Sequence, residues 1–162
     1  MLNRQAANNR FQLGILSQLM ADLDDGKLLT PGAGHGHSPV WILGHLALVA
    51  EMGQQLLGGT VQHPEWMPLF GPGSSGEVTP EQAPSRELLM TSVLEGYTRL
   101  QEMATSEDCE PYLSQDHGFA PFANSPISDV GDLVALMLTN HFGFHLAQLS
   151  SCRREAGFPP LF

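Results

Sequence analysis

Three histidines stand where the helical pattern of the sequence calls for apolar side chains: His45, His141 and His145. His141 and His145 are four residues apart, so on a helix both imidazoles project from one face, with Cβ atoms roughly 6 Å apart. Imidazoles at this spacing can bind one ion at metal–nitrogen distances of about 2.0–2.1 Å. We therefore predict that the three histidines bind one divalent transition metal and leave coordination positions open for water or substrate.

Each of these histidines also has a simpler interpretation. His45 taken alone could be a hydrogen-bonded core residue, and the pair His141 and His145 could serve packing. The metal interpretation is favoured because all three fall on apolar stripes, where an unpaired imidazole costs about 1–3 kcal/mol. Gln148, on the same stripe, could hydrogen-bond a ligand imidazole or a substrate, or could lie at the bundle margin. Tyr97 could reach the site, or could be a core aromatic with its hydroxyl at the edge.

The other four histidines are weaker candidates. His35 and His37 are flanked by glycines in a predicted loop, where ordering the chain around an ion costs conformational entropy. His63 and His117 fall in two long predicted loops and could line the mouth of a pocket. Exposed loop positions are the simpler interpretation of both.

No carboxylate is placed to act as a general base. At about 100° per residue, Glu51 lies about 240° around its helix from His45, and Asp132 lies nearly opposite His141. The sequence also lacks serine-hydrolase, zinc-protease and phosphate-loop motifs. An open metal ion could activate water for hydrolysis, or bind a substrate thiol as thiolate. The missing base slightly favours the thiol.

Four helices must position these residues, because apolar side chains repeat at three- and four-residue intervals over four segments. The predicted segments run from about Gln5 to Asp25, from Ser38–Pro39 to Gly58–Gly59, from Pro84–Ser85 to about Ala104, and from Ser125–Pro126 to Gly157. Serine followed by proline is a strong helix-start signal, because serine caps the first turn and proline fits the first helical position. We assign Phe11 to the buried stripe of the first helix. The predicted fold is all-α: one domain over residues 1–162, folded as a four-helix bundle.

Two long connections join these helices. Residues 60–83 contain the glycine-rich run 71–76, which predicts an exposed crossover with a flexible tip. Residues 106–124 are rich in aromatic side chains, which predicts a loop packed on the bundle. Four-helix bundles accommodate one or two such long crossovers.

Composition limits the partners. The net charge is −10, from 17 acidic and 7 basic residues, which repels phosphate backbones and argues against nucleic acids and anionic membrane surfaces. No apolar run approaches the length of a transmembrane helix, and residues 1–5 lack the pattern of a signal peptide, so we expect a cytoplasmic protein. Cys109 and Cys152 form no CxxC pair and are expected to be free thiols. We expect a small-molecule substrate.

The segments around the histidines resemble the DinB/YfiT-like family. Residues 41–46, Trp-Ile-Leu-Gly-His-Leu, are similar to the start of that family's second helix, and residues 140–149 are similar to its His-x₃-His-x₂-Gln helix. The resemblance extends over the whole chain in helix order and loop lengths. It implies a four-helix bundle with a long crossover after the second helix, which binds nickel or zinc through His45, His141 and His145. Residues 145–148 read His-Leu-Ala-Gln where the family has His-Arg-Gly-Gln, so any contact of that arginine is not carried over.

Members of that family include thiol S-transferases that use low-molecular-weight thiols, a thiol-dependent isomerase and proposed hydrolases. The resemblance therefore implies a metal-dependent enzyme, either a thiol-dependent S-transferase or a hydrolase, and a homodimer. The alternative is a non-enzymatic stress-response protein that binds a metal or a small ligand, or whose metal only stabilises the fold. In a third interpretation no metal binds, and the three histidines are core residues.

Overall fold

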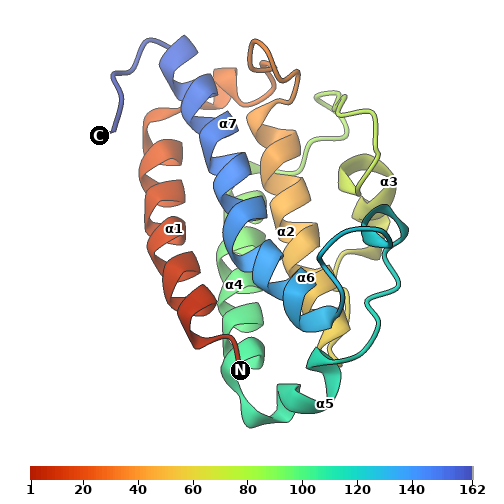
Figure 1. Cartoon of the computed structure of the whole chain (residues 1–162). Coiled ribbons are helices and arrows are strands. Elements are labelled where there is room, and N and C mark those ends of the chain that lie inside the picture. The colour runs from red at the N-terminus through yellow and green to blue at the C-terminus, as the bar shows by residue number, and fades with distance from the viewer. Residues whose placement is uncertain (162) are drawn as a thin grey trace.

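The computed structural model describes residues 1–161, and this part of the chain is helical without any β-strand (Figure 1). The helices are α1 (Asn3–Asp22), α2 (Pro39–Leu56), α3 (Met67–Phe70), α4 (Arg86–Thr105), α5 (Glu110–Leu113), α6 (Val130–Leu136) and α7 (Phe142–Glu155). Short 3₁₀ turns cover Asp25–Lys27, Pro64–Trp66, Glu107–Cys109 and Ala120–Phe122, and a π-helical turn, Met137–His141, joins α6 to α7. The all-α prediction is confirmed. No helix in the described range is both long and apolar enough to cross a membrane.

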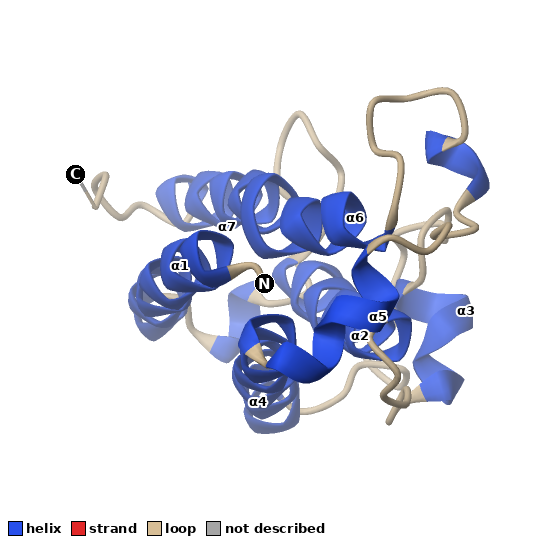
Figure 2. Ribbon diagram, turned by 60° about the horizontal axis from the view of Figure 1, so that its bottom comes forward, coloured by secondary structure: helices blue, strands red, loops and turns tan. Residues whose placement is uncertain are grey.

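The long helices lie side by side around a common apolar interior (Figures 1 and 2). α2 packs most extensively against α4, α1 packs against α7 and α4, and α2 also contacts α7. Leucine and isoleucine side chains from the facing sides are fully buried between them, among them Leu16, Ile42, Leu43, Leu100 and Leu138. Removing this apolar surface from water is the main stabilising contribution to the arrangement.

The starts of α2 and α4 agree with the sequence prediction. Ser38 accepts a hydrogen bond from the Trp41 backbone N–H at 3.3 Å, and Pro39 occupies the first helical position. Ser85 accepts one from the Leu88 backbone N–H at 3.2 Å. Each serine therefore satisfies a first-turn N–H that has no partner inside the helix.

The last long helix begins later than predicted. The Ser125–Pro126 pair lies in a turn, where the Ser125 hydroxyl accepts from the Ile127 backbone N–H at 3.1 Å. Helix α6 starts instead at Val130, because the Asp129 carboxylate caps it by accepting from the Asp132 backbone N–H at 2.9 Å. A serine next to a proline can thus close a turn as readily as it starts a helix.

Helix α1 also departs from the prediction. It ends at Asp22, ahead of the predicted end at Asp25, and a 3₁₀ turn follows. Phe11 is 66% exposed, so its assignment to the buried stripe is wrong. At about 100° per residue Phe11 lies about 140° around the helix from the buried Leu16.

The connection between α2 and α4 is held against α2. The buried carboxylate of Glu51 accepts from the backbone N–H groups of Gln62 at 2.8 Å and His63 at 2.9 Å. Further along, Phe70 at the end of α3 is fully buried beside Gly44. More than half of residues 60–70 are exposed, as predicted, but a buried carboxylate and a buried aromatic ring anchor this half of the connection to α2.

The connection between α4 and α6 is packed on the helices, as predicted. Cys109 is buried, and Phe119 and Phe122 pack against a small apolar cluster formed by Val49, Leu133 and Met137. This connection therefore contributes side chains to the space beside α2 and α6.

Candidate metal centre

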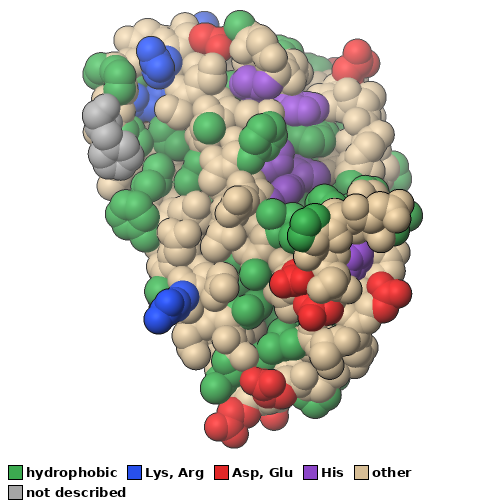
Figure 3. All heavy atoms as spheres, in the orientation of Figure 1, with side chains coloured by type: hydrophobic (Ala, Val, Ile, Leu, Met, Phe, Trp, Pro, Cys, Tyr) green, Lys and Arg blue, Asp and Glu red, His purple; other side chains and the backbone are tan. Residues whose placement is uncertain are grey.

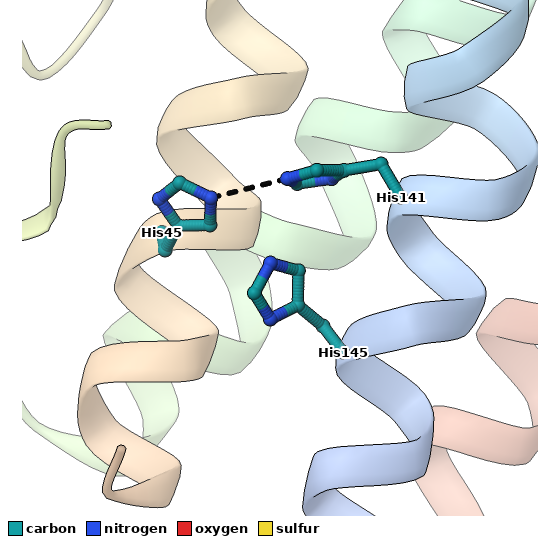
Figure 4. Close-up of side chains that lie close together, drawn as sticks. All are labelled: His45, His141 and His145. Carbon is teal, nitrogen blue, oxygen red and sulfur yellow. Dashed lines mark hydrogen bonds between the residues drawn. The ribbon is translucent and has the colours of Figure 1, made fainter. Parts of the chain in front are cut away.

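The structure brings His45, His141 and His145 together between α2 and α7 (Figure 4). One nitrogen from each ring lies within 4.8 Å of the other two, and the Nε2 atoms of His45 and His141 are 3.1 Å apart. A tetrahedral ion with metal–nitrogen bonds of about 2.0–2.1 Å needs donor atoms about 3.3 Å apart. The three side chains are therefore close enough to bind one metal ion.

A backbone carbonyl orients His45. Its Nδ1–H donates to the carbonyl oxygen of Phe70 at 2.7 Å, which leaves the Nε2 lone pair facing His141. The Trp41 ring stacks on the His45 imidazole with centroids 4.7 Å apart. Such an outer hydrogen bond fixes the tautomer and the orientation of a ligand imidazole. This hydrogen bond could not be predicted from the sequence, because a carbonyl partner can come from any residue type.

A side chain orients His145. Its Nδ1–H donates to Oε1 of Gln148 at 2.7 Å, and both side chains are buried. The other ring nitrogen, Nε2, faces the rings of His45 and His141 (Figure 4). Of the alternatives for Gln148 considered from the sequence, the structure shows the hydrogen bond to an imidazole.

His141 has no such partner. Its Nδ1 is buried without a hydrogen bond to any residue in the range 1–161, and its Nε2 faces another imidazole. His141 ends the π-helical turn, a feature often found at functional sites. The sequence did not predict this turn, because the spacing of His141 and His145 fits an ordinary α-helix.

The electrostatics of the site favour neutral imidazoles. Burial lowers the pKa of His45, although the hydrogen bond to Phe70 partly offsets this. Burial, and then the neighbouring imidazoles, lower the pKa of His141 to about 4 and that of His145 to about 3. Neutral rings carry the free lone pair that a metal ion requires, so the triad does not have to lose protons near neutral pH.

Tyr97 is a core residue. It is fully buried and packs edge-to-face on Phe142 with ring centroids 4.7 Å apart. Its hydroxyl is buried too, with no hydrogen-bond partner among residues 1–161, so the expected position at the edge of the core is wrong. Burial raises the pKa of this phenol. Tyr97 does not line the cavity that borders His45 and His141.

The remaining histidines lie outside the triad. His37 stacks on Trp41 with centroids 3.9 Å apart, and Nε2 of His35 lies 3.8 Å from Sγ of Cys152. Both cysteines are buried free thiols, as expected. Burial raises the pKa of Cys152 to about 11, so this thiol is protonated near neutral pH.

The two loop histidines have structural contacts. Nδ1 of His63 lies 2.5 Å from the Glu51 carboxylate. This contact turns the carboxylate away from the triad, as the position of Glu51 on its helix predicted. His117 donates from Nε2 to the Ile127 carbonyl at 3.1 Å and accepts at Nδ1 from the Phe119 backbone N–H at 2.8 Å. His117 also lines the cavity beside the triad, as considered from the sequence.

A cavity of about 380 Å³ borders two of the three histidines, His45 and His141. On the surface view, histidine side chains gather on the upper half of one face, with hydrophobic side chains beside them (Figure 3). The candidate site is therefore reached from outside, and a small molecule can approach the histidine cluster.

Replacing Gln148 with leucine is expected to lower the affinity for nickel or zinc about 10–100-fold, because His145 loses the acceptor that fixes its ring. Titration calorimetry of the purified variant measures this. Gln148→Glu is the matched control, since a carboxylate can accept the same N–H and should retain affinity. Equal affinities of the leucine and glutamate variants would show that this hydrogen bond does not tune the site.

A scan of known protein families finds no family model that matches the chain, and a search of curated proteins finds no match. The site geometry and the sequence motifs are thus the basis for assigning a function.

Proposed function

We propose that this protein is a metal-dependent enzyme that binds nickel or zinc through His45, His141 and His145. One observation carries the proposal: a nitrogen from each ring converges on one point, while hydrogen bonds hold the far nitrogens of two rings. The helix arrangement and the anchored connection after α2 also support membership of the DinB/YfiT-like family of four-helix bundles.

The residues around the triad define what the site can do. A bound ion would supply a Lewis acid that lowers the pKa of water or of a thiol in an open position. Phe70 and Gln148 orient two of the ligands, and the cavity beside His45 and His141 offers space for a substrate. Within the described chain, no carboxylate lines this cavity. That composition favours thiol-dependent S-transfer, with a low-molecular-weight thiol as co-substrate. Hydrolysis is less favoured, because a general base from the protein would normally assist it.

Metal binding is the first test. Protein stripped with a chelator and titrated with nickel and with zinc is expected to bind one ion per chain. X-ray absorption of the loaded protein should show three nitrogen donors at about 2.0–2.1 Å. Absence of binding for both metals would reject the proposal and leave three core histidines.

Turnover is the second test. Loaded protein is offered a small thiol with an aryl chloride electrophile, and separately an activated ester. Thioether formation identifies an S-transferase, and ester cleavage identifies a hydrolase. A loaded protein that performs neither reaction supports the non-enzymatic alternative, a protein that binds a metal or a small ligand. We also propose a homodimer, which sedimentation analysis tests directly.

A further inference from the structure

The cavity beside the triad has a strongly apolar wall. It lies between α2, α6 and the connection that precedes α6, and apolar side chains form most of it, among them Val49, Met52, Phe119, Phe122, Leu133 and Leu136. Leu133 and Val49 are buried, whereas Leu136 and both phenylalanines are half-buried. Such a wall favours the binding of an apolar molecule, because the contact removes the apolar surfaces of both the wall and the molecule from water.

The cavity contains no charged partner for a ligand. In the part of the chain that the structure describes, none of its lining residues is Lys, Arg, Asp or Glu. A charged ligand would therefore lose its hydration without gaining a counter-charge from the wall, which is costly. Both ring nitrogens of His117 are already hydrogen-bonded to the backbone, and Gln55 is exposed to solvent. The remaining polar atoms belong to His45 and His141 at the inner end.

The cavity reaches the triad from one side. His45 and His141 line it, whereas His145 and Trp41 do not. Trp41 instead stacks on the His45 ring, and His37 stacks on Trp41. The π-helical turn contributes both Met137 and His141 to the wall. A molecule in the cavity therefore meets the triad at the edge formed by His45 and His141.

The volume limits the size of the ligand. An apolar cavity of about 150 Å³ holds one benzene molecule, so about 380 Å³ has room for roughly two fused rings. We propose that the cavity binds an uncharged, apolar substrate of about the size of a bicyclic aromatic, with its one polar atom directed at the edge formed by His45 and His141. This orientation rests on the proposed function, in which a metal at the triad receives that atom.

Two probes with the same rings test the inference. 2-Naphthol is uncharged near neutral pH, and naphthalene-2-sulfonate carries a permanent negative charge. Titration calorimetry of metal-free and nickel-loaded protein is expected to show 2-naphthol binding to both forms, at least about tenfold more tightly than the sulfonate. Leu136→Trp, which fills the cavity from its half-buried side, should weaken 2-naphthol binding at least about tenfold. Val49→Phe fills it from α2 and serves as a second variant if the first does not fold.

Leu94→Trp is the matched control, because Leu94 is a half-buried leucine of α4 outside this cavity. It should leave 2-naphthol binding unchanged, and circular dichroism shows that each variant is folded. The inference is overturned if protein that binds nickel does not bind 2-naphthol, or if naphthalene-2-sulfonate binds as tightly as 2-naphthol. It is also overturned if both cavity-filling variants are folded and bind 2-naphthol with wild-type affinity. Protein that binds 2-naphthol but no metal would overturn the proposed function and leave the apolar ligand class intact.

Discussion

Replacing His141 with leucine is expected to lower the affinity for nickel or zinc more than about 100-fold, because loss of a ligand exceeds the 10–100-fold effect of losing an outer partner. The metal-free protein should be as stable as the wild type, or more stable by about 1 kcal/mol. The wild-type side chain buries Nδ1 without a partner and directs Nε2 at His45. Leucine of similar size removes that unpaired polar group. Metal titration and urea unfolding of both proteins measure the two effects.

His35→Leu is the matched control for this prediction. His35 is another half-buried histidine near α7, and its ring contacts Cys152 instead of the triad. Its replacement should leave metal affinity unchanged. If metal-free His141→Leu protein is several kcal/mol less stable than the wild type, His141 is a structural core residue, and the metal interpretation loses its main physical support.

Gly44→Ala is expected to destabilise the protein by about 1–3 kcal/mol and to weaken metal binding about 10–100-fold. A Cβ atom at Gly44 would lie 2.6 Å from the fully buried Phe70 ring, so the ring would have to shift. Because the Phe70 carbonyl holds Nδ1 of His45, displacement of Phe70 also disturbs a ligand. Urea unfolding and nickel titration check the two losses separately.

Gly14→Ala on α1 provides the comparison for Gly44. A Cβ at Gly14 meets no heavy atom within 4 Å. Alanine there should stabilise the helix by about 0.5–1 kcal/mol and leave metal affinity unchanged. A Gly44→Ala protein that is destabilised but binds metal with full affinity would show that the Phe70 carbonyl does not position His45.

The sequence was most informative where a residue pattern is compatible with only one local structure. The capped starts of α2 and α4 were predictable because Ser38 and Ser85 satisfy first-turn N–H groups that nothing else can reach. The meeting of the three histidines was also predictable, since imidazoles on facing apolar stripes must approach one another. The start of α6 was not, because the Ser125–Pro126 pair suits a turn as well as a helix.

The site was predicted less completely than the fold. The position of Gln148 left two interpretations open, and the structure shows its hydrogen bond to His145. The hydrogen bond from His45 to the Phe70 carbonyl could not be predicted from residue types, because the position of that carbonyl depends on how the connection after α2 packs. The apolar cavity depends in the same way on Phe119 and Phe122, whose positions follow from tertiary packing alone.

The π-helical turn Met137–His141 sets the rotation of α6 relative to α7. A π-turn is equivalent to an α-helix with one residue inserted, so a deletion such as that of Asn140 would restore a regular helix. Helix α6 would then rotate by about 100° relative to α7, which would carry Leu133 and Leu136 away from the cavity. The interval between His141 and His145 would stay the same, so such a deletion would move the cavity wall and leave the spacing of the ligand pair unchanged.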